Sequence, residues 1–153
     1  KILIAGDTKI HTGTDYCEKI GTFIQKNQLE EQVMLTGFIE DMPAFYNAID
    51  LFLLPSFREP FGRVLIEAMA TEKPVIASMV DGVPEIVSTD SNNGFLVKLH
   101  DWDMWLHYIK QLIDNPQLAM RIGKEGRKRV EKYFSITTQM EKLEKIYKSL
   151  VSQ

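Results

Sequence analysis

Two carboxylates, Glu59 and Glu67, are the side chains whose type and spacing could best do chemistry. Glu67 falls on a segment that is apolar almost all round when residues are set about 100° apart, and it shares one narrow polar stripe with Arg63. A carboxylate on such a buried helix needs a partner or an opening. Glu59 lies in a loop after an expected strand, and in open parallel sheets the carboxyl ends of the strands are where ligands bind. The pair therefore predicts a ligand site.

The elements that must position the two glutamates are a strand and a helix. The apolar run Leu51–Leu54 is too short for a helix and is bounded by Pro55, which favours a strand buried on both faces. Pro60 is tolerated as a first helical residue, so a helix is expected from Phe61 onward. The start of that helix offers unpaired backbone N–H groups, which favour an anion. These donors belong to Phe61, Gly62, Arg63 and Val64.

The stretch from Glu59 to Glu67, opened by Pro60-Phe61-Gly62, resembles the E-x7-E signature of retaining, nucleotide-sugar-dependent glycosyltransferases of the GT-B fold. The preceding strand and two downstream segments appear in the order typical of that family. The segments are Gly82-Val83-Pro84-Glu85 and Asn93-Gly94-Phe95-Leu96-Val97. The resemblance implies that the chain is the carboxyl-terminal, donor-binding domain of such an enzyme.

The resemblance also implies a role for each matching residue. Glu59 would be catalytic and face the donor sugar, and Glu67 would hold the ribose hydroxyls, since an ionised carboxylate only accepts hydrogen bonds and a diol offers two donors. The diphosphate would lie at the helix start, and Gly62 would let it approach the backbone closely. The remaining donor contacts would be made through Phe61, Arg63, Val64 and Gly82, with Phe38 and Ile39 near the base. Asp81 stands where the family usually has a glycine, which puts a close backbone approach to the donor in question there.

Structural interpretations of the same residues stay open. Arg63 and Glu67 could form a surface ion pair worth roughly 0.2–0.5 kcal/mol, and Glu59 could favour a helix start through the helix dipole. Phe38 could belong to the core, and Glu85 could either shape the donor site or cap a short helix.

Metal binding is disfavoured by the sequence. The Asp101-Trp102-Asp103 stretch matches the metal-binding mark of the other large glycosyltransferase fold, but Asp101 is placed to cap a helix. The three histidines lack the spacing of a metal site. We therefore expect no metal and no cofactor, with a nucleotide-diphosphate sugar as substrate.

Composition limits the function classes. The 153 residues, 44% hydrophobic and 25% charged, predict one soluble globular domain, and no apolar stretch approaches the roughly 20 residues that cross a bilayer. The net charge of −3 argues against nucleic-acid binding, although the stretch 121–148 holds nine Lys and Arg against four Asp and Glu. That basic stretch favours a solvated helix face over a surface for anionic lipid. A single cysteine, Cys17, fits a reducing compartment and a cytoplasmic location.

Alternating strands and helices predict an α/β fold, a Rossmann-like doubly wound parallel sheet with extra carboxyl-terminal helices over residues 117–153. Gly6-Asp7 lacks the G-x-G-x-x-G spacing, which disfavours a nicotinamide-binding version. Strands are expected at residues 1–5, 33–35, 51–54, 73–78 and 95–97, and helices at 15–27, 61–70, 101–114, 117–133 and 136–150, with a short one after Asp41. In the first helix, Cys17, Ile20, Ile24 and Phe23 are expected to face inward.

The abrupt start at Lys1 suggests an excised piece, residues 1–153, that lacks the first strand-helix unit of its domain and the amino-terminal acceptor domain. The parent would transfer a sugar from a nucleotide-diphosphate sugar to an acceptor hydroxyl with retention, in polysaccharide or lipid-linked glycan assembly. The resemblance leaves peripheral association with the inner face of a membrane open. The piece alone is expected to be inactive. The alternatives are a nucleotide-sugar epimerase or phosphorylase and a non-catalytic binding module.

Overall fold

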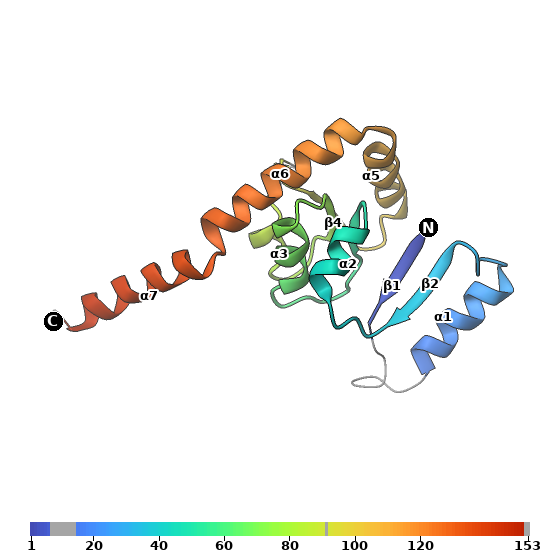
Figure 1. The fold of residues 1–153 in the computed structure, drawn as a ribbon, viewed down its shortest axis with the longest axis horizontal. Helices are drawn as coiled ribbons and strands as arrows, with labels where there is room; N and C mark the ends of the chain where they lie inside the picture. Colours follow the sequence, from blue (N-terminus) through green and yellow to red (C-terminus); the bar gives the residue numbers. More distant parts are fainter. Residues whose placement is uncertain (7–14, 91, 152–153) are drawn as a thin grey trace. The chain divides into compact units, whose positions relative to one another are not determined.

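The computed structural model describes residues 1–6, 15–90 and 92–151. The chain folds into two compact units, Lys1–Phe45 and Tyr46–Gln153. Figure 1 traces the elements of both units along the sequence.

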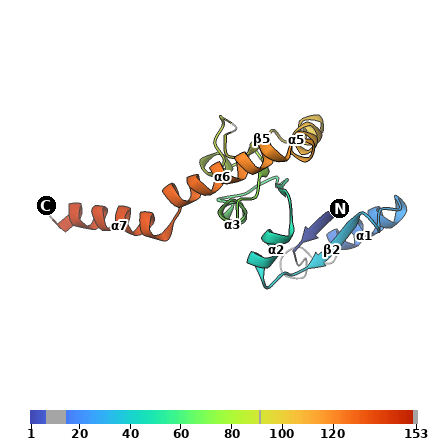
Figure 2. The same ribbon diagram turned by 45° about the horizontal axis from the view of Figure 1, so that its top comes forward.

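The first unit contains β1 (Ile2–Ala5), α1 (Asp15–Lys26) and β2 (Val33–Gly37). The two strands pair in parallel, with Ile2 opposite Val33, and α1 runs alongside them in both views (Figures 1 and 2). The next helix, α2 (Met42–Ala48), begins where Asp41 Oδ1 accepts the backbone N–H of Ala44 at 2.9 Å. The predicted elements of this unit and the Asp41 cap are confirmed.

The burial expected in the first unit is wrong at several positions. Ile2 is 54% exposed and its strand neighbours are also exposed, although residues 1–5 were expected to form a buried strand. Phe23 is 61% exposed rather than inward, whereas Ile24 is buried. Two strands and one helix within this unit cannot cover both faces of a sheet. The inward position expected for Cys17 lies outside the described side chains.

The second unit holds a parallel sheet of three strands in the order β3-β4-β5. Its strands are β3 (Phe52–Leu54), β4 (Val75–Ser78) and β5 (Phe95–Val97), and its helices are α3 (Arg63–Ala70), α4 (Val83–Ile86), α5 (Trp102–Asp114), α6 (Pro116–Tyr133) and α7 (Ile136–Val151). The central strand β4 is buried throughout. β3 is half-buried rather than buried on both faces, because it is an edge strand of this sheet.

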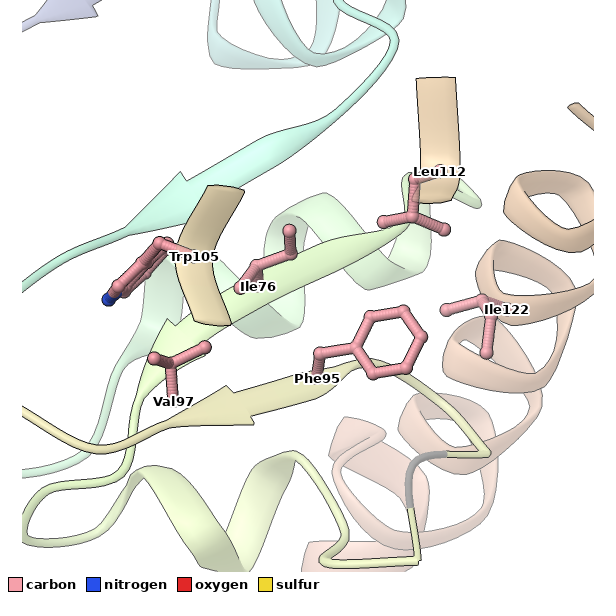
Figure 3. Packing of buried hydrophobic residues seen from close by; sticks show 6 residues of the cluster. All are labelled: Ile76, Phe95, Val97, Trp105, Leu112 and Ile122. Atoms are coloured by element: carbon pink, nitrogen blue, oxygen red, sulfur yellow. The ribbon is translucent and has the colours of Figure 1, made fainter. Parts of the chain in front are cut away.

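One hydrophobic core cluster of the second unit lies where α5 and α6 meet the sheet (Figure 3). Ile76 of β4 and Val97 of β5 point into it beside Trp105 of α5. Leu112 and Ile122 close the cluster from α5 and α6, next to Phe95, whose ring stacks on Tyr108 at a centroid distance of 4.1 Å. Burial of these large side chains, together with that of Leu65, Met69 and Ile86 on α3 and α4, stabilises the second unit.

The helix α6 lies directly against α3, as both ribbon views show (Figures 1 and 2). Glycine makes this possible, since a Cβ on Gly123 would lie 2.0 Å from the carbonyl oxygen of Glu72, just after α3. Asn115 caps α6 by accepting the Leu118 N–H, and Ser135 caps α7 by accepting the Thr138 N–H. The expected cap at Ser135 is confirmed.

The α/β class with parallel strands and extra carboxyl-terminal helices is confirmed. The strand pairings of the described residues fall into two sheets, of two and of three strands. Within the described ranges, no helix has the length and apolar character needed to cross a membrane.

Candidate functional site

The candidate site lies at the carboxyl end of the second unit's sheet, where the loop after β3 meets the loop after β4. The backbone N–H of Glu59 donates to Asp81 Oδ2 at 3.1 Å, and the Gly82 N–H donates to the Glu59 carbonyl at 3.4 Å. Because β3 and β4 run parallel, both loops leave the sheet at the same edge. The structure thus brings together Glu59 and Gly82, which the sequence predicted as site residues.

The helix α3 begins at Arg63, two residues later than the sequence predicted. Pro60 is therefore not its first residue, and Gly62 is the N-cap, with a left-handed φ of 87°. That conformation interrupts the helix and suits glycine, which has no Cβ to clash with its own backbone. Glycine is thus required at this position by the local backbone.

The Glu59 carboxylate is turned toward the start of α3. Its Oε1 accepts the backbone N–H of Gly62 at 2.9 Å, so the expectation that this N–H is unpaired is wrong. A side-chain oxygen near a helix start provides an acceptor for a backbone N–H that has no partner within the helix. The N–H groups of Phe61, Arg63 and Val64 find no acceptor among the described residues. Three donors therefore remain at this helix end.

Glu67 lies one turn after Arg63, about 6 Å further along the axis of α3. It is half-buried, and its Oε2 accepts the hydroxyl of Tyr46 at 2.9 Å. Arg63 is exposed, and no ion pair joins it to Glu67 in the described part of the chain. The surface ion pair considered from the sequence is therefore absent there, and Glu67 is held by a tyrosine.

Tyr46 is a functional candidate that the sequence did not single out. Its side chain is 1% exposed, and its ring meets the Phe52 ring edge-on at a centroid distance of 5.7 Å. Burial first, and then the hydrogen bond and the charge of Glu67, raise the pKa of Tyr46 above its ordinary value. Its polar hydroxyl in the short helix expected after Asp41 was the sequence signal for it.

Asp81 is the second residue whose role the sequence did not predict. It replaces the glycine of the resembling loop and adopts a left-handed φ of 40°, a conformation that costs a residue with a side chain some strain. Its carboxylate holds the Glu59 N–H and lies 3.7 Å from Arg58 Nε. Asp81 therefore ties the loop that carries Glu59 to the loop after β4.

Gly82 packs against the protein backbone. A Cβ placed on it would lie 2.3 Å from the carbonyl oxygen of Pro60, which no side chain tolerates. The close approach that requires glycine at this position is thus between the two loops. A donor contact of Gly82 stays a prediction.

A groove of about 580 Å³ is bordered by Phe61. It is lined by Phe61, Ile66, Glu85, Arg129, Tyr133, Phe134, Gln139 and Lys142. Neither Glu59 nor Glu67 lines this groove, so it is separate from the carboxylate pair. Arg129, which no sequence pattern singled out, donates to the carbonyls of Ile86 and Glu85 at 2.7 and 2.8 Å and so caps the end of α4 from α6.

Phe38 and Ile39 lie in the first compact unit, after β2. Phe38 is 70% exposed, which excludes the alternative that it belongs to the core, and Ile39 is half-buried. Their contact with a nucleotide base stays a prediction.

The described residues hold no group of three side chains suited to a metal ion. Asp101 accepts the Met104 N–H at 3.2 Å and caps α5, as its place in the sequence predicted. The local role of Asp101 is therefore that of a helix cap.

The chain is similar in sequence to proteins of a known family. The family model described as glycosyl transferases group 1 matches residues 1–129. The capsular polysaccharide biosynthesis glycosyltransferase CapM of Staphylococcus aureus is 34% identical to the whole chain, which spans 39% of the length of that relative.

Solved structures of glycosyltransferases share the fold. Sucrose-phosphate synthase from Thermosynechococcus elongatus matches 98% of the chain with a TM-score of 0.85 and 31% identity, over 38% of its own length. Anabaena HepE, solved in complex with UDP-glucose, matches 99% of the chain with a TM-score of 0.82 and 28% identity, over 40% of its own length. The fold is that of GT-B glycosyltransferases.

Proposed function

The chain belongs to the glycosyl transferases group 1 family, and from this we propose that its parent protein transfers a sugar from a nucleotide-diphosphate sugar to an acceptor hydroxyl with retention. The described chain would bind the donor. The chain spans about two fifths of the relatives it matches, so the acceptor site and the remaining phosphate contacts would come from elsewhere in the parent.

The observation that carries the proposal is the arrangement at the start of α3. Glu59 accepts the N–H of Gly62, the N-cap of α3, and Glu67 lies on α3 with one oxygen that accepts the Tyr46 hydroxyl. Between them in the sequence lie the N–H groups of Phe61, Arg63 and Val64, which have no acceptor within the part of the chain that the structure describes. The carboxylate of Glu59 would accept hydrogen bonds from the sugar hydroxyls, and that of Glu67 would accept them from the ribose. The N–H groups between them would bind the diphosphate, so the order of the protein groups matches the order of sugar, diphosphate and ribose in the donor.

Each group would have a distinct task in the reaction. As the bond to the diphosphate breaks, the leaving group gains negative charge, and the N–H groups at the start of α3 would stabilise it. Glu59 would fix the orientation of the sugar through its hydroxyls while the sugar becomes cation-like, and Glu67 would hold the ribose. HepE binds UDP-glucose, which supports a nucleotide-diphosphate sugar as the class of donor.

The test replaces each glutamate by glutamine in the full-length parent. Glu59→Gln and Glu67→Gln should each lower transfer about 10- to 100-fold, because each loses a charge-assisted hydrogen bond. The assay uses a panel of uridine, guanosine and adenosine diphosphate sugars. Glu131→Gln, on the exposed face of α6, is the matched control and should stay within about twofold of wild type.

The result also separates the alternative functions. Full transfer activity in both glutamine variants would contradict the proposal. Nucleotide binding without turnover in the wild-type parent would favour a binding module, and epimerised or phosphorolysed products would favour the other enzyme classes.

A further inference from the structure

Glu67 is a half-buried carboxylate on the mostly apolar helix α3. It stands on a helix whose other side chains are mostly apolar, with Leu65, Ala68 and Met69 fully buried around it. A carboxylate in such surroundings is costly unless it is hydrogen-bonded. Among the described residues the carboxylate accepts one hydrogen bond, from the Tyr46 hydroxyl to Oε2.

The donor of that bond is itself held rigidly. The Tyr46 ring is buried and lies edge-on to Phe52 of β3, so its hydroxyl has little freedom to move. A phenol has one proton to donate, and a buried phenol beside a carboxylate keeps it. Tyr46 therefore fixes the position of one particular oxygen of Glu67.

We infer that Tyr46 is a positioning residue for ligand binding, and the inference rests on the proposed function. It sets the Glu67 carboxylate so that Oε1, which has no partner among the described residues, faces the ribose hydroxyls of the donor. A carboxylate has about four lone-pair sites, so one bond from Tyr46 leaves enough acceptors for a diol. Without the hydroxyl, the Glu67 carboxylate loses its fixed direction.

The experiment removes only the hydroxyl, with Tyr46→Phe in the full-length parent. The probes are uridine, guanosine and adenosine diphosphates, each with its 2′-deoxy counterpart, titrated by calorimetry. For the nucleotide that wild type binds, Tyr46→Phe should raise Kd about three- to tenfold, below the full effect of losing a hydrogen bond to a charged group. The preference for the ribonucleotide over its 2′-deoxy form should shrink by a similar factor.

A double-mutant cycle distinguishes positioning from a structural role. If Tyr46 acts through Glu67, then Tyr46→Phe has no further effect on Kd once Glu67→Gln is present. The matched control is Tyr108→Phe, which removes a hydroxyl from a half-buried tyrosine stacked on Phe95 and should leave both affinities unchanged.

Folding is checked by circular dichroism. Because Glu67 is only half-buried, water can replace the lost hydroxyl, and Tyr46→Phe is expected to fold. Should it fail to fold, Glu67→Asp provides the second arm, since it keeps the charge and Tyr46 but withdraws the carboxylate by one methylene. It should lose the ribose preference in the same way.

The outcomes are distinct. An unchanged Kd in Tyr46→Phe overturns the inference. An equal loss of affinity for ribo- and deoxynucleotides, additive with the loss in Glu67→Gln, overturns it as well. Both results leave the proposed function standing. If wild type binds nucleotide and Glu67→Gln binds it equally well, the proposed role of Glu67 fails together with the inference.

Discussion

At the scale of single residues, Glu59 and Glu67 are each held by a group that lies outside α3. Glu59 is anchored through its backbone N–H to Asp81 and through its carboxylate to Gly62, whereas Glu67 is bonded to Tyr46. Both carboxylates thus have a defined direction before any ligand binds. Such preorganisation reduces the ordering that a ligand must impose.

The contact between the two site loops predicts that adding one methyl group at Gly82 lowers the free energy of unfolding. Gly82→Ala would place a Cβ 2.3 Å from the Pro60 carbonyl oxygen and force the loops apart, so we expect a loss of about 1–3 kcal/mol in unfolding free energy. The backbone φ of Gly82 is −81°, an ordinary value, so the cost is steric. Denaturant unfolding measures it.

Gly21→Ala is the matched control for that substitution. Gly21 lies within α1, and a Cβ there would meet nothing within 4 Å. Alanine is the better helix former, so this variant should be neutral or slightly more stable. Equal stability of the two variants would show that the loop contact at Gly82 tolerates a side chain.

At the scale of elements, the site depends on how closely α6 lies against α3. Gly123 allows the approach, and Arg129 on the same helix holds the end of α4, which follows the Asp81 loop. The helix α6 therefore supports both segments that carry the site. Gly123 matters for packing, since it lies within a helix where alanine would otherwise be preferred.

The two buried glycines of α6, Gly123 and Gly126, should differ in how much an alanine substitution destabilises the protein. Gly123→Ala would put a Cβ 2.0 Å from the Glu72 carbonyl oxygen and should cost about 1–3 kcal/mol, with a lower Tm. Gly126→Ala would meet its nearest atoms at 3.4 Å, which is ordinary contact, and should cost much less. Thermal unfolding of both variants tests the difference, and a similar Tm for the two would contradict this account of the helix packing.

At the scale of the whole molecule, the chain is much shorter than the relatives that it matches. It spans 39% of the length of the capsular polysaccharide relative. The helix α7 exposes an apolar set of side chains along most of its length, consisting of Ile136, Met140, Leu143, Ile146, Tyr147, Leu150 and Val151. Exposed apolar surface of this extent is typical of an interaction surface.

We predict that the purified chain of 153 residues has no sugar-transfer activity and binds nucleotide weakly. The start of α3 provides backbone hydrogen-bond donors for a diphosphate, and the proposal assigns the remaining phosphate contacts to the rest of the parent. The assay compares the chain with its full-length parent on the same donors and acceptors. Measurable transfer by the chain alone would refute the prediction.

The sequence alone determined the features that depend on neighbouring residues. The helix caps at Asp41, Asp101 and Ser135 were predicted, because a cap bonds to an N–H only three residues away. The strands β4 and β5 followed from short apolar runs between turn residues. The family followed from Glu59 and Glu67 together with the strand before them, the Pro60-Phe61-Gly62 that opens the helix and the two downstream segments in their order.

The tertiary structure decided which groups hold the two glutamates. The bonds from Tyr46 to Glu67, from Glu59 to Asp81 and from Arg129 to Ile86 join residues 21, 22 and 43 positions apart. The late start of α3 likewise depends on the left-handed Gly62, packed against Leu65 and Ile86. Sequence spacing gives the hydrophobic faces and the caps, whereas partners at these separations depend on how strands and helices pack, which no local pattern encodes.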